Sequence, residues 1–552
     1  MDWLVSRHTS PLGAVESPLV FTTIFAVILW SGWYLWRFYV APTLYPNEPR
    51  LLPYWIPYLG HTFSFLRRAE DVYLRAEKYF ANTDEPYSVV LMGGVSVIIR
   101  NIKDLSIVWR NTTALSYDPF TSRMLMAFGI TPRHVRNLYE PDPARLLNDE
   151  KTREQSLLYR ANPKKLSYMH LQSQWFKTQL LPGDHLKGLL QVYPVYLSRF
   201  LQIPQLRRGM SSETQGDETK ASSVTVPLGR FCRYVLAQSA FRTFFGEELF
   251  EVEPQFAHIY QRWEDASWKV FYNIPPLLAP GLHSDRKRTI AALAVYLDLP
   301  DSQRKNTAWI FGAMNSELTN LGLPASDRAG LIMMICWAIN NNAHYIAFWM
   351  FAHILCDANL KTAVISEINA CFPNPSATSG GSASPPTDDY QGCDMDKLVT
   401  GCPQLNALWA EALRLYNFST AVRKAVDDCS VNHNGQTFNI RKGQQVFGPV
   451  RNFHRTDGSI FGDATTAFDH TRFLRDPKIR QAKEYFPFGG GHTLCPGRHF
   501  AEREIYLLVA LTLRRFEVTV VGDHPTVPPI NYDMPALAAA APKGELFVTL
   551  RR

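Results

Sequence analysis

The sequence feature that most constrains the fold is a glycine-rich loop around one of the eight cysteines. It reads FPFGGGHTLCPGR over residues 486–498, with Cys495 between three consecutive glycines and a Pro-Gly pair. Glycine permits positive φ angles and close approach of the backbone to a ligand. The segment that follows, HFAEREIYLLVALTLRRF, predicts an amphipathic helix whose N-terminus stabilises a nearby thiolate. A buried structural cysteine beside a turn is the alternative for an isolated cysteine, but the complete pattern favours an axial ligand to an iron.

Composition narrows the class of protein. The chain has 552 residues, of which 46% are hydrophobic and 19% charged, so it can bury a large core and long disorder is not expected. The net charge of +7 is spread without a Lys/Arg-dense stripe, so no nucleic-acid partner is expected. A mildly basic surface suits an acidic protein partner or an anionic membrane leaflet. The cysteines form no CxxC pair, which indicates a reducing compartment.

The N-terminus carries an uncharged apolar segment, SPLVFTTIFAVILWSGWYLW, at residues 17–36. Its length matches the hydrocarbon core of a bilayer, about 30 Å. A cleaved signal peptide would need a small-residue cleavage site, which the following WYLWRFY lacks, and a buried core helix is the other alternative. We therefore expect a membrane anchor at residues 1–37, a connector stiffened by prolines at 38–60, and a catalytic domain at 61–552. Arg37 and Arg50 after the span, against Arg7 before it, favour a cytoplasmic body.

Apolar periodicity in the body is mainly helical, and short β-rich runs lie at intervals along it. The predicted helices are around Leu228–Phe245 and Leu331–Leu355, the β-rich runs are Tyr87–Ile99, Val518–Val521 and Leu546–Leu550, and the expected polar loops are residues 204–224 and Asn374–Asp389. Strands and helices do not alternate as βαβ units. The predicted fold class is therefore mainly α with small β-sheets, preceded by a single transmembrane helix.

The cysteine loop resembles the heme-binding loop of the cytochrome P-450 superfamily, and the resemblance extends over roughly residues 40 to 552. The matching positions are Phe488, Gly491, Thr493, Cys495 and Gly497. Thr493 stands where the family usually has an arginine, which is similar to the branch containing the cholesterol 7α-hydroxylases. The resemblance implies a mainly helical cytochrome P-450 fold, heme b held by the Cys495 thiolate, and electrons from NADPH through a separate reductase.

Two further motifs fall in the order that the family has. Glu411 and Arg414 lie three apart on a predicted helix, and Arg472 follows in FDHTRF, where His470 replaces the usual proline. The resemblance implies that Glu411, Arg414 and Arg472 form a network behind the heme loop, whereas a surface i,i+3 salt bridge is the alternative for the first two.

The resemblance also implies residues that contact the heme. Arg423 in STAVRKAV matches a propionate-binding position, and an ordinary exposed arginine is its alternative. The other candidate contacts are Phe488, His492, Thr493 and Arg498. Trp175 is followed four residues later by Gln179 rather than Arg, so no second propionate partner is identified.

Residues 331–352, LIMMICWAINNNAHYIAFWMFA, predict a long buried helix, which in the family crosses over the heme. A second membrane span is the alternative, but three asparagines and His344 make it costly. Asn342 occupies the position where the family usually has an acid, and Ala343 occupies the position of the threonine that follows it. Neither residue can donate a proton as a carboxylic acid does. Consecutive asparagines also weaken the helix and favour a local opening. We expect protons to arrive by water, by His344 or from a substrate hydroxyl.

These features predict a heme-thiolate monooxygenase of the endoplasmic reticulum membrane, with a single span and a cytoplasmic catalytic domain. The relaxed motifs resemble fungal biosynthetic members, which implies a lipophilic terpenoid or steroid-like substrate. The expected partners are the reductase, for which Arg498, Arg503, Arg514 and Arg515 are candidate docking residues, and the lipid bilayer. Ala343 leaves open an oxygen-independent isomerase or dehydratase of the prostacyclin-synthase type. A non-catalytic heme sensor is a third alternative.

Overall fold

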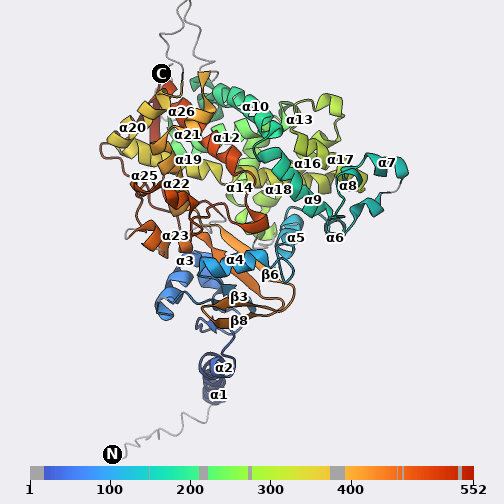
Figure 1. Cartoon of the computed structure of the whole chain (residues 1–552), viewed down its shortest axis with the longest axis vertical. Coiled ribbons are helices and arrows are strands. Elements are labelled where there is room, and N and C mark those ends of the chain that lie inside the picture. Colours follow the sequence, from blue (N-terminus) through green and yellow to red (C-terminus); the bar gives the residue numbers. More distant parts are fainter. Residues whose placement is uncertain are drawn as a thin grey trace, which may run out of the picture. The chain divides into compact units, whose positions relative to one another are not determined.

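The computed structural model describes residues 18–81, 83–147, 149–210, 222–271, 276–372, 392–456, 458–462, 465–532 and 538–552. Helices predominate and the sheets are small, so the predicted mainly α fold class is confirmed (Figure 1). The chain divides into two compact units. The first comprises residues 1–65, 70–115 and 424–447, and the second comprises residues 66–69, 116–423 and 448–552. The predicted loop Asn374–Asp389 lies outside the described residues.

The first unit contains the N-terminal helix, further helices, strands of a mixed sheet and the separate two-stranded sheet β7-β8. Its elements, some of which end across the unit boundary, are α1 (Pro18–Leu35), a π-helical turn (Trp36–Val40), α2 (Ala41–Leu44), β1 (Arg50–Leu51), α3 (Thr62–Tyr79), β2 (Tyr87–Leu91), β3 (Gly94–Ile98), α4 (Ile102–Arg110), β7 (Cys429–His433), β8 (Gln436–Ile440) and β9 (Gln445–Pro449). β1 is parallel to β2, β2 antiparallel to β3, and β3 parallel to β9. The predicted β-rich run 87–99 is thus a hairpin, whose two turn residues Met92 and Gly93 both have positive φ, as a tight hairpin turn requires.

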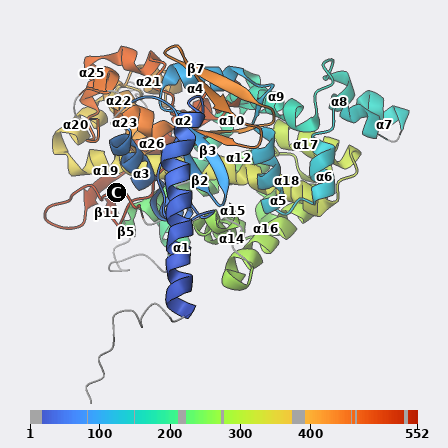
Figure 2. The ribbon, with the colours of Figure 1, turned by 90° about the horizontal axis from the view of Figure 1, so that it is seen from below.

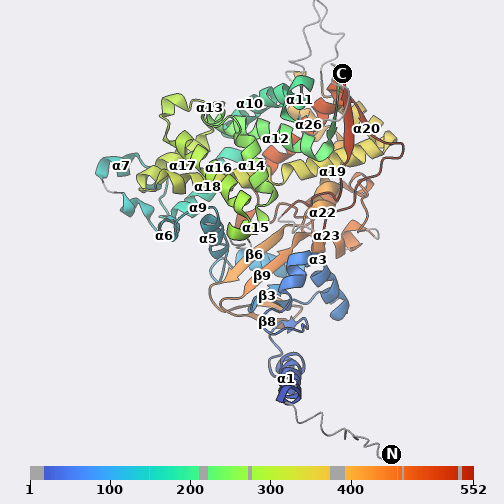
Figure 3. The same cartoon turned by 180° about the vertical axis from the view of Figure 1, so that it is seen from behind.

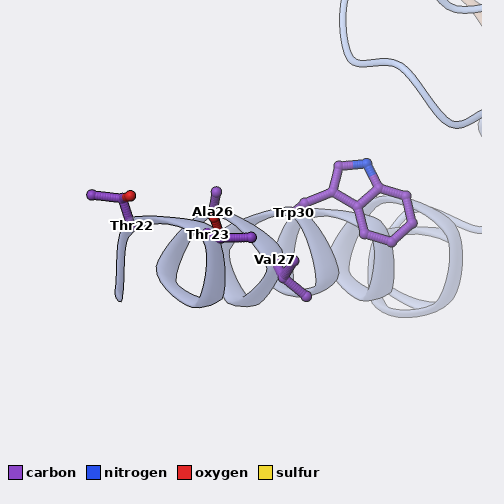
Figure 4. Close-up of a pocket in the computed structure, with 5 residues that line it drawn as sticks. All are labelled: Thr22, Thr23, Ala26, Val27 and Trp30. Carbon is purple, nitrogen blue, oxygen red and sulfur yellow. The ribbon is translucent and has the colours of Figure 1, made fainter. Parts of the chain in front are cut away.

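The helix at the N-terminus extends beyond the expected span. Within the described part of the chain, residues 20–44, which include most of α1 (Figure 2), are the one helical stretch long and apolar enough to cross a membrane. None of these residues is buried. The first residues of the proline-stiffened connector expected at 38–60 are helical as far as Leu44. Pro42 lies in the first turn of α2, where a backbone N–H is not needed, and the π-helical turn precedes it. The hollow beside Trp30 in Figure 4 is open surface of this single helix and offers no reactive side chain.

Aromatic residues of the connector pack against the C-terminal end of α1. Trp30 stacks on Trp55 with ring centroids 5.6 Å apart, and its indole N–H donates to the Trp55 carbonyl at 2.8 Å. Trp33 contacts Tyr54 at a centroid distance of 5.6 Å. The connector is therefore held against the helix by specific contacts, as expected for a strut rather than a loose linker.

The second unit carries most of the helices and a three-stranded antiparallel sheet in the order β10-β11-β5. Its helices are α5 (Asp118–Ala127), α6 (Pro132–Leu138), α7 (Glu150–Gln155), α8 (Leu157–Arg160), α9 (Tyr168–Leu180), α10 (Asp184–Phe200), α11 (Ile203–Gly209), α12 (Leu228–Phe245), α13 (Glu248–Val252), α14 (Phe256–Asp265), α15 (Trp268–Phe271), α16 (Pro280–Asp298), α17 (Trp309–Asn320), α18 (Ala325–Asn340), α19 (Ala343–Cys356), α20 (Ala358–Asn369), α21 (Met395–Thr400), α22 (Pro403–Tyr416), α23 (Val450–Thr456), α24 (Gly458–Phe461), α25 (Thr471–Arg475) and α26 (Arg498–Arg515). Its strands are β5 (Ser223–Pro227), β10 (Glu517–Val520) and β11 (Phe547–Arg551), while β4 (Leu115–Ser116) and β6 (Thr420–Ala425) cross the unit boundary.

Helix α19 lies at the centre of this unit and contacts α12, α22 and α26 (Figures 1 and 3). Its side chains are almost all apolar and buried around the whole circumference, which is typical of a central core helix. This burial excludes the alternative of a second membrane span for residues 331–352. The expected loop 204–224 was partly wrong, because its first residues form α11 and its last two belong to β5. Val224 of β5 turns into the core, which accounts for that strand.

Candidate functional site

The cysteine loop leads directly into α26. Gly489 and Gly491 adopt φ angles of +72° and +61°, which favour glycine. The Cys495 N–H donates to the Phe488 carbonyl at 3.0 Å and closes the loop. Burial raises the pKa of the Cys495 thiol, while the backbone N–H groups of Gly497 and Arg498 act in the opposite direction. Because a coordinating thiol is deprotonated by the metal itself, this fixed sulfur at a helix N-terminus has the setting of a metal ligand.

Arg423 on β6 is a buried cation that contacts the same loop. Its Nη2 donates to Thr493 Oγ1 at 2.8 Å and its Nη1 to the Val422 carbonyl at 2.8 Å. The guanidinium lies over the Tyr117 ring at 5.5 Å from the centroid. Burial lowers the pKa of Arg423, its Nε has no hydrogen-bond partner, and no carboxylate among the described residues pairs with it. A buried guanidinium without a counterion is costly, so an anionic group of a ligand fits here.

The ionic cluster behind the loop is centred on Glu411, which is completely buried on α22. Its carboxylate accepts from Arg414 Nε at 2.7 Å and Nη2 at 2.8 Å, and from Arg472 Nε at 3.1 Å. The Asp469 N–H donates to it at 2.8 Å. The three residues singled out in the sequence thus lie in direct contact, and Glu411 and Arg414 do not form a surface salt bridge.

Two residues that sequence reasoning missed connect this cluster to the cysteine loop. His454 on α23 donates from Nδ1 to the Arg414 carbonyl at 3.3 Å and accepts at Nε2 from the Phe486 N–H at 3.2 Å. Asn417 donates to the Pro487 carbonyl. No local pattern marks either residue, because each contact joins segments far apart in the chain.

The predicted long helix is interrupted at Asn341 and Asn342, between α18 and α19. The expected weakening by the asparagines therefore coincides with a real break. Asn342 Oδ1 accepts from the Ala539 N–H at 3.1 Å, so this side chain holds a neighbouring loop. His344 is buried, and its Nδ1 lies 3.0 Å from the Asn340 carbonyl. Burial lowers the pKa of His344 to about 3, so it is neutral at neutral pH and cannot store a proton there.

The remaining candidates lie on the same loop or helix. Phe488 packs against the core beside Trp409, whereas His492 is exposed. Arg498 Nη1 donates to the Cys495 carbonyl at 2.8 Å, so this arginine supports the loop. Among the basic residues considered for docking, the others also contact the protein: Arg503 bonds to the His499 carbonyl, Arg514 to Asn369 and Arg515 to Ser198.

A half-buried cysteine at the start of a helix, a buried Glu-Arg-Arg cluster and, among the described residues, a buried cation without a counterion are the features expected of a heme-thiolate class of protein. The family model for cytochrome P450 matches residues 348–546. The chain is 23% identical to cytochrome P450 monooxygenase poxD of Penicillium oxalicum over 92% of this chain and 94% of the relative. It is 24% identical to cholesterol 7-alpha-monooxygenase of Cricetulus griseus, covering 67% and 73%, and 24% identical to cytochrome P450 7B1 of Mus musculus, covering 87% and 86%.

Residues 348–546 thus match the cytochrome P450 family, and the chain is similar over most of its length to cytochrome P450 monooxygenases, so the comparisons support a monooxygenase related to the branch with the 7-alpha-hydroxylases. The recognition made from the cysteine loop is confirmed.

Proposed function

We propose that this chain is a membrane-anchored monooxygenase in which Cys495 is the axial thiolate ligand of heme b. The position of Cys495, between the glycine turn and the N-terminus of α26, is the observation that carries this assignment. A heme held by Cys495 would supply the chemistry of dioxygen cleavage, which the electron-donating thiolate would assist. Glu411, Arg414 and Arg472 hold together the segments behind the cysteine loop. Hydrogen bonds from His454 and Asn417 to residues 486 and 487 then fix the start of that loop.

Arg423 is the proposed partner of a heme propionate. Thr493 cannot carry a charge, but it receives a hydrogen bond from Arg423 and so orients the guanidinium. The unsatisfied Nε of Arg423 is available to an anionic acceptor. A propionate would supply the counterion that this buried cation lacks.

The proposed substrate is lipophilic and either terpenoid or steroid-like, and it enters from the bilayer. The name of one relative refers to cholesterol, and other relatives are fungal monooxygenases. The apolar helix at residues 20–44 supports a single-span anchor, which we place in the endoplasmic reticulum membrane with the catalytic domain in the cytoplasm. Electrons come from NADPH through a separate reductase, and we place the reaction in secondary-metabolite biosynthesis.

The test is reconstitution in phospholipid vesicles with an NADPH-dependent reductase and a panel of sterols and terpenoids. We expect NADPH oxidation and oxygen uptake that rise together with an oxygenated product. Because Ala343 lacks the hydroxyl that the family usually has, the same panel is also incubated without NADPH. Product formation in the absence of NADPH and oxygen would contradict the proposal and establish the isomerase alternative.

A further inference from the structure

Two buried thiols meet where α20 ends and α22 begins. Cys371 follows the C-terminal end of α20, and Cys402 is the residue directly before α22. Their Sγ atoms are 3.4 Å apart, although the two cysteines are separated by 31 positions in the sequence. Both belong to the hydrophobic core of the helical unit. A single cysteine in such surroundings is inert, so the direct contact between two sulfur atoms is what distinguishes this pair.

The surroundings of Cys371 decide which thiol donates in this contact. The Cys371 thiol donates to the Glu367 carbonyl, with Sγ and O 3.5 Å apart, because a carbonyl oxygen only accepts. Since a thiol has one hydrogen, the contact between the sulfurs is a donation from Cys402 to Cys371. Burial raises the pKa of the Cys402 thiol, and its hydrogen bond to Cys371 raises this pKa further. Cys371 Sγ therefore accepts from Cys402, and Cys402 keeps its proton until a reaction removes it.

The junction that holds the two sulfurs is also joined by a carboxylate. Glu367 on α20 accepts from the Gln404 N–H at 3.0 Å and from the Leu405 N–H at 3.3 Å. It thus caps the N-terminus of α22, where the Cys402 side chain makes no capping bond. The same helix carries Glu411, the centre of the ionic cluster behind the cysteine loop. A stronger link at this junction therefore acts on the helix that positions that cluster.

We propose that Cys371 and Cys402 form a reversible disulfide when the protein meets a peroxide, and that this bond braces the start of α22. Cys371 is 3% exposed and Cys402 0%, so hydrogen peroxide reacts first at Cys371. The Cys371 sulfur bonds to one peroxide oxygen, the O–O bond breaks, one water leaves, and a sulfenic acid remains. The Cys402 sulfur then attacks the Cys371 sulfur, the S–O bond breaks, and the Cys402 proton leaves in a second water. Two thiols are oxidised while one peroxide is reduced to two waters.

The position of the two cysteines in the chain suits a bond that forms and is reduced again. Both lie outside their helices, so the sulfurs can move together without either helix unwinding. The absence of CxxC pairs indicates a reducing compartment, in which the pair stays reduced until an oxidant appears. A bond across 31 positions restricts the unfolded chain, so the oxidised protein should unfold at a higher temperature. None of these steps depends on the heme.

The test uses the full-length protein in phospholipid vesicles, first reduced with dithiothreitol, then freed of it and treated with hydrogen peroxide. After the remaining thiols are blocked with N-ethylmaleimide, mass spectrometry of the digest should find the Cys371 and Cys402 peptides joined, with the loss of two hydrogens. The melting temperature measured by circular dichroism should rise by about 2–5 °C. Dithiothreitol should reverse both changes.

Variants separate this bond from a general effect of peroxide, each being compared with its own reduced form. Cys371→Ala and Cys402→Ala should show neither the joined peptides nor the rise in melting temperature. Cys232→Ala is the matched control, because it removes an equally buried thiol from α12. This control should respond to peroxide as the parent does.

Three results would overturn the inference. The first is a treated parent in which Cys371 and Cys402 stay reduced or carry only sulfinic or sulfonic groups. The second is a bond made by Cys393 instead, a half-buried thiol that packs against the same core. The third is a bond between Cys371 and Cys402 that leaves the melting temperature unchanged, which would exclude the bracing of α22. A parent without a heme spectrum would contradict the proposed function alone, since the joined peptides and the melting shift are measured without heme.

Discussion

Replacing Glu411 by Gln tests how much the buried cluster contributes to stability. Gln keeps the size of the side chain but removes the charge that two arginines share, with distances of 2.7 Å to Arg414 Nε and 3.1 Å to Arg472 Nε. Breaking a buried ion pair by removing one partner costs about 3–5 kcal/mol. Because a folded protein is stable by only about 5–15 kcal/mol, the variant should lose a large part of its stability and retain heme poorly.

The assay is thermal unfolding followed by circular dichroism at a fixed scan rate, together with the heme content per protein. Asp142→Asn is the matched control, because Asp142 and Arg145 also form an i,i+3 pair but the Arg145 side chain is 73% exposed. Exposed pairs contribute little, so this control should melt close to the parent. Equal melting of Glu411→Gln and Asp142→Asn would refute the reasoning that burial makes the Glu411 cluster essential.

Three further predictions follow from the same geometry. Arg423→Gln should weaken heme retention by about tenfold or more, and Arg423→Lys, which keeps the charge, should weaken it less. Heme transfer to apomyoglobin measures this retention. If the parent and Arg423→Gln retained heme equally, the propionate role of Arg423 would be contradicted. Burial lowers the pKa of His344, His353 and His454 to about 3 in the folded protein. In the unfolded chain a histidine has a pKa of about 6.5, so below that pH the unfolded chain binds more protons than the folded protein. The free energy of unfolding should therefore fall as the pH drops from about 6.5 towards about 3. His454→Gln should reduce this slope by about 1.4 kcal/mol per pH unit in urea unfolding, and an unchanged slope would exclude the effect. Deletion of residues 1–36 should abolish sedimentation with vesicles but leave the carbon monoxide spectrum intact; persistent sedimentation would contradict a sole membrane anchor.

Local patterns predicted most of the fold. The apolar periodicity at Leu228–Phe245 coincides with α12, and the β-rich run 87–99 is the hairpin of β2 and β3. These elements are decided by neighbouring residues, namely by which faces are apolar and by turn residues that accept positive φ. The extension of the N-terminal helix through Pro42 was not predicted, because it depends on a π-helical turn that accommodates the proline.

The site was predictable where its chemistry lies in one short motif. Cys495 and its glycines are contiguous, and Glu411 and Arg414 are one helical turn apart. His454 and Asn417 could not be found in this way. They act through hydrogen bonds to residues 486 and 487, which lie far from them in the sequence.

The most direct test of the central claim is the absorption spectrum of the reduced protein with carbon monoxide, recorded for the parent and for Cys495→Ala. The parent should give the red-shifted Soret band typical of thiolate-ligated heme, and the variant should lose that band. A parent without the band, or a variant that keeps it, would contradict the assignment of Cys495 as the iron ligand.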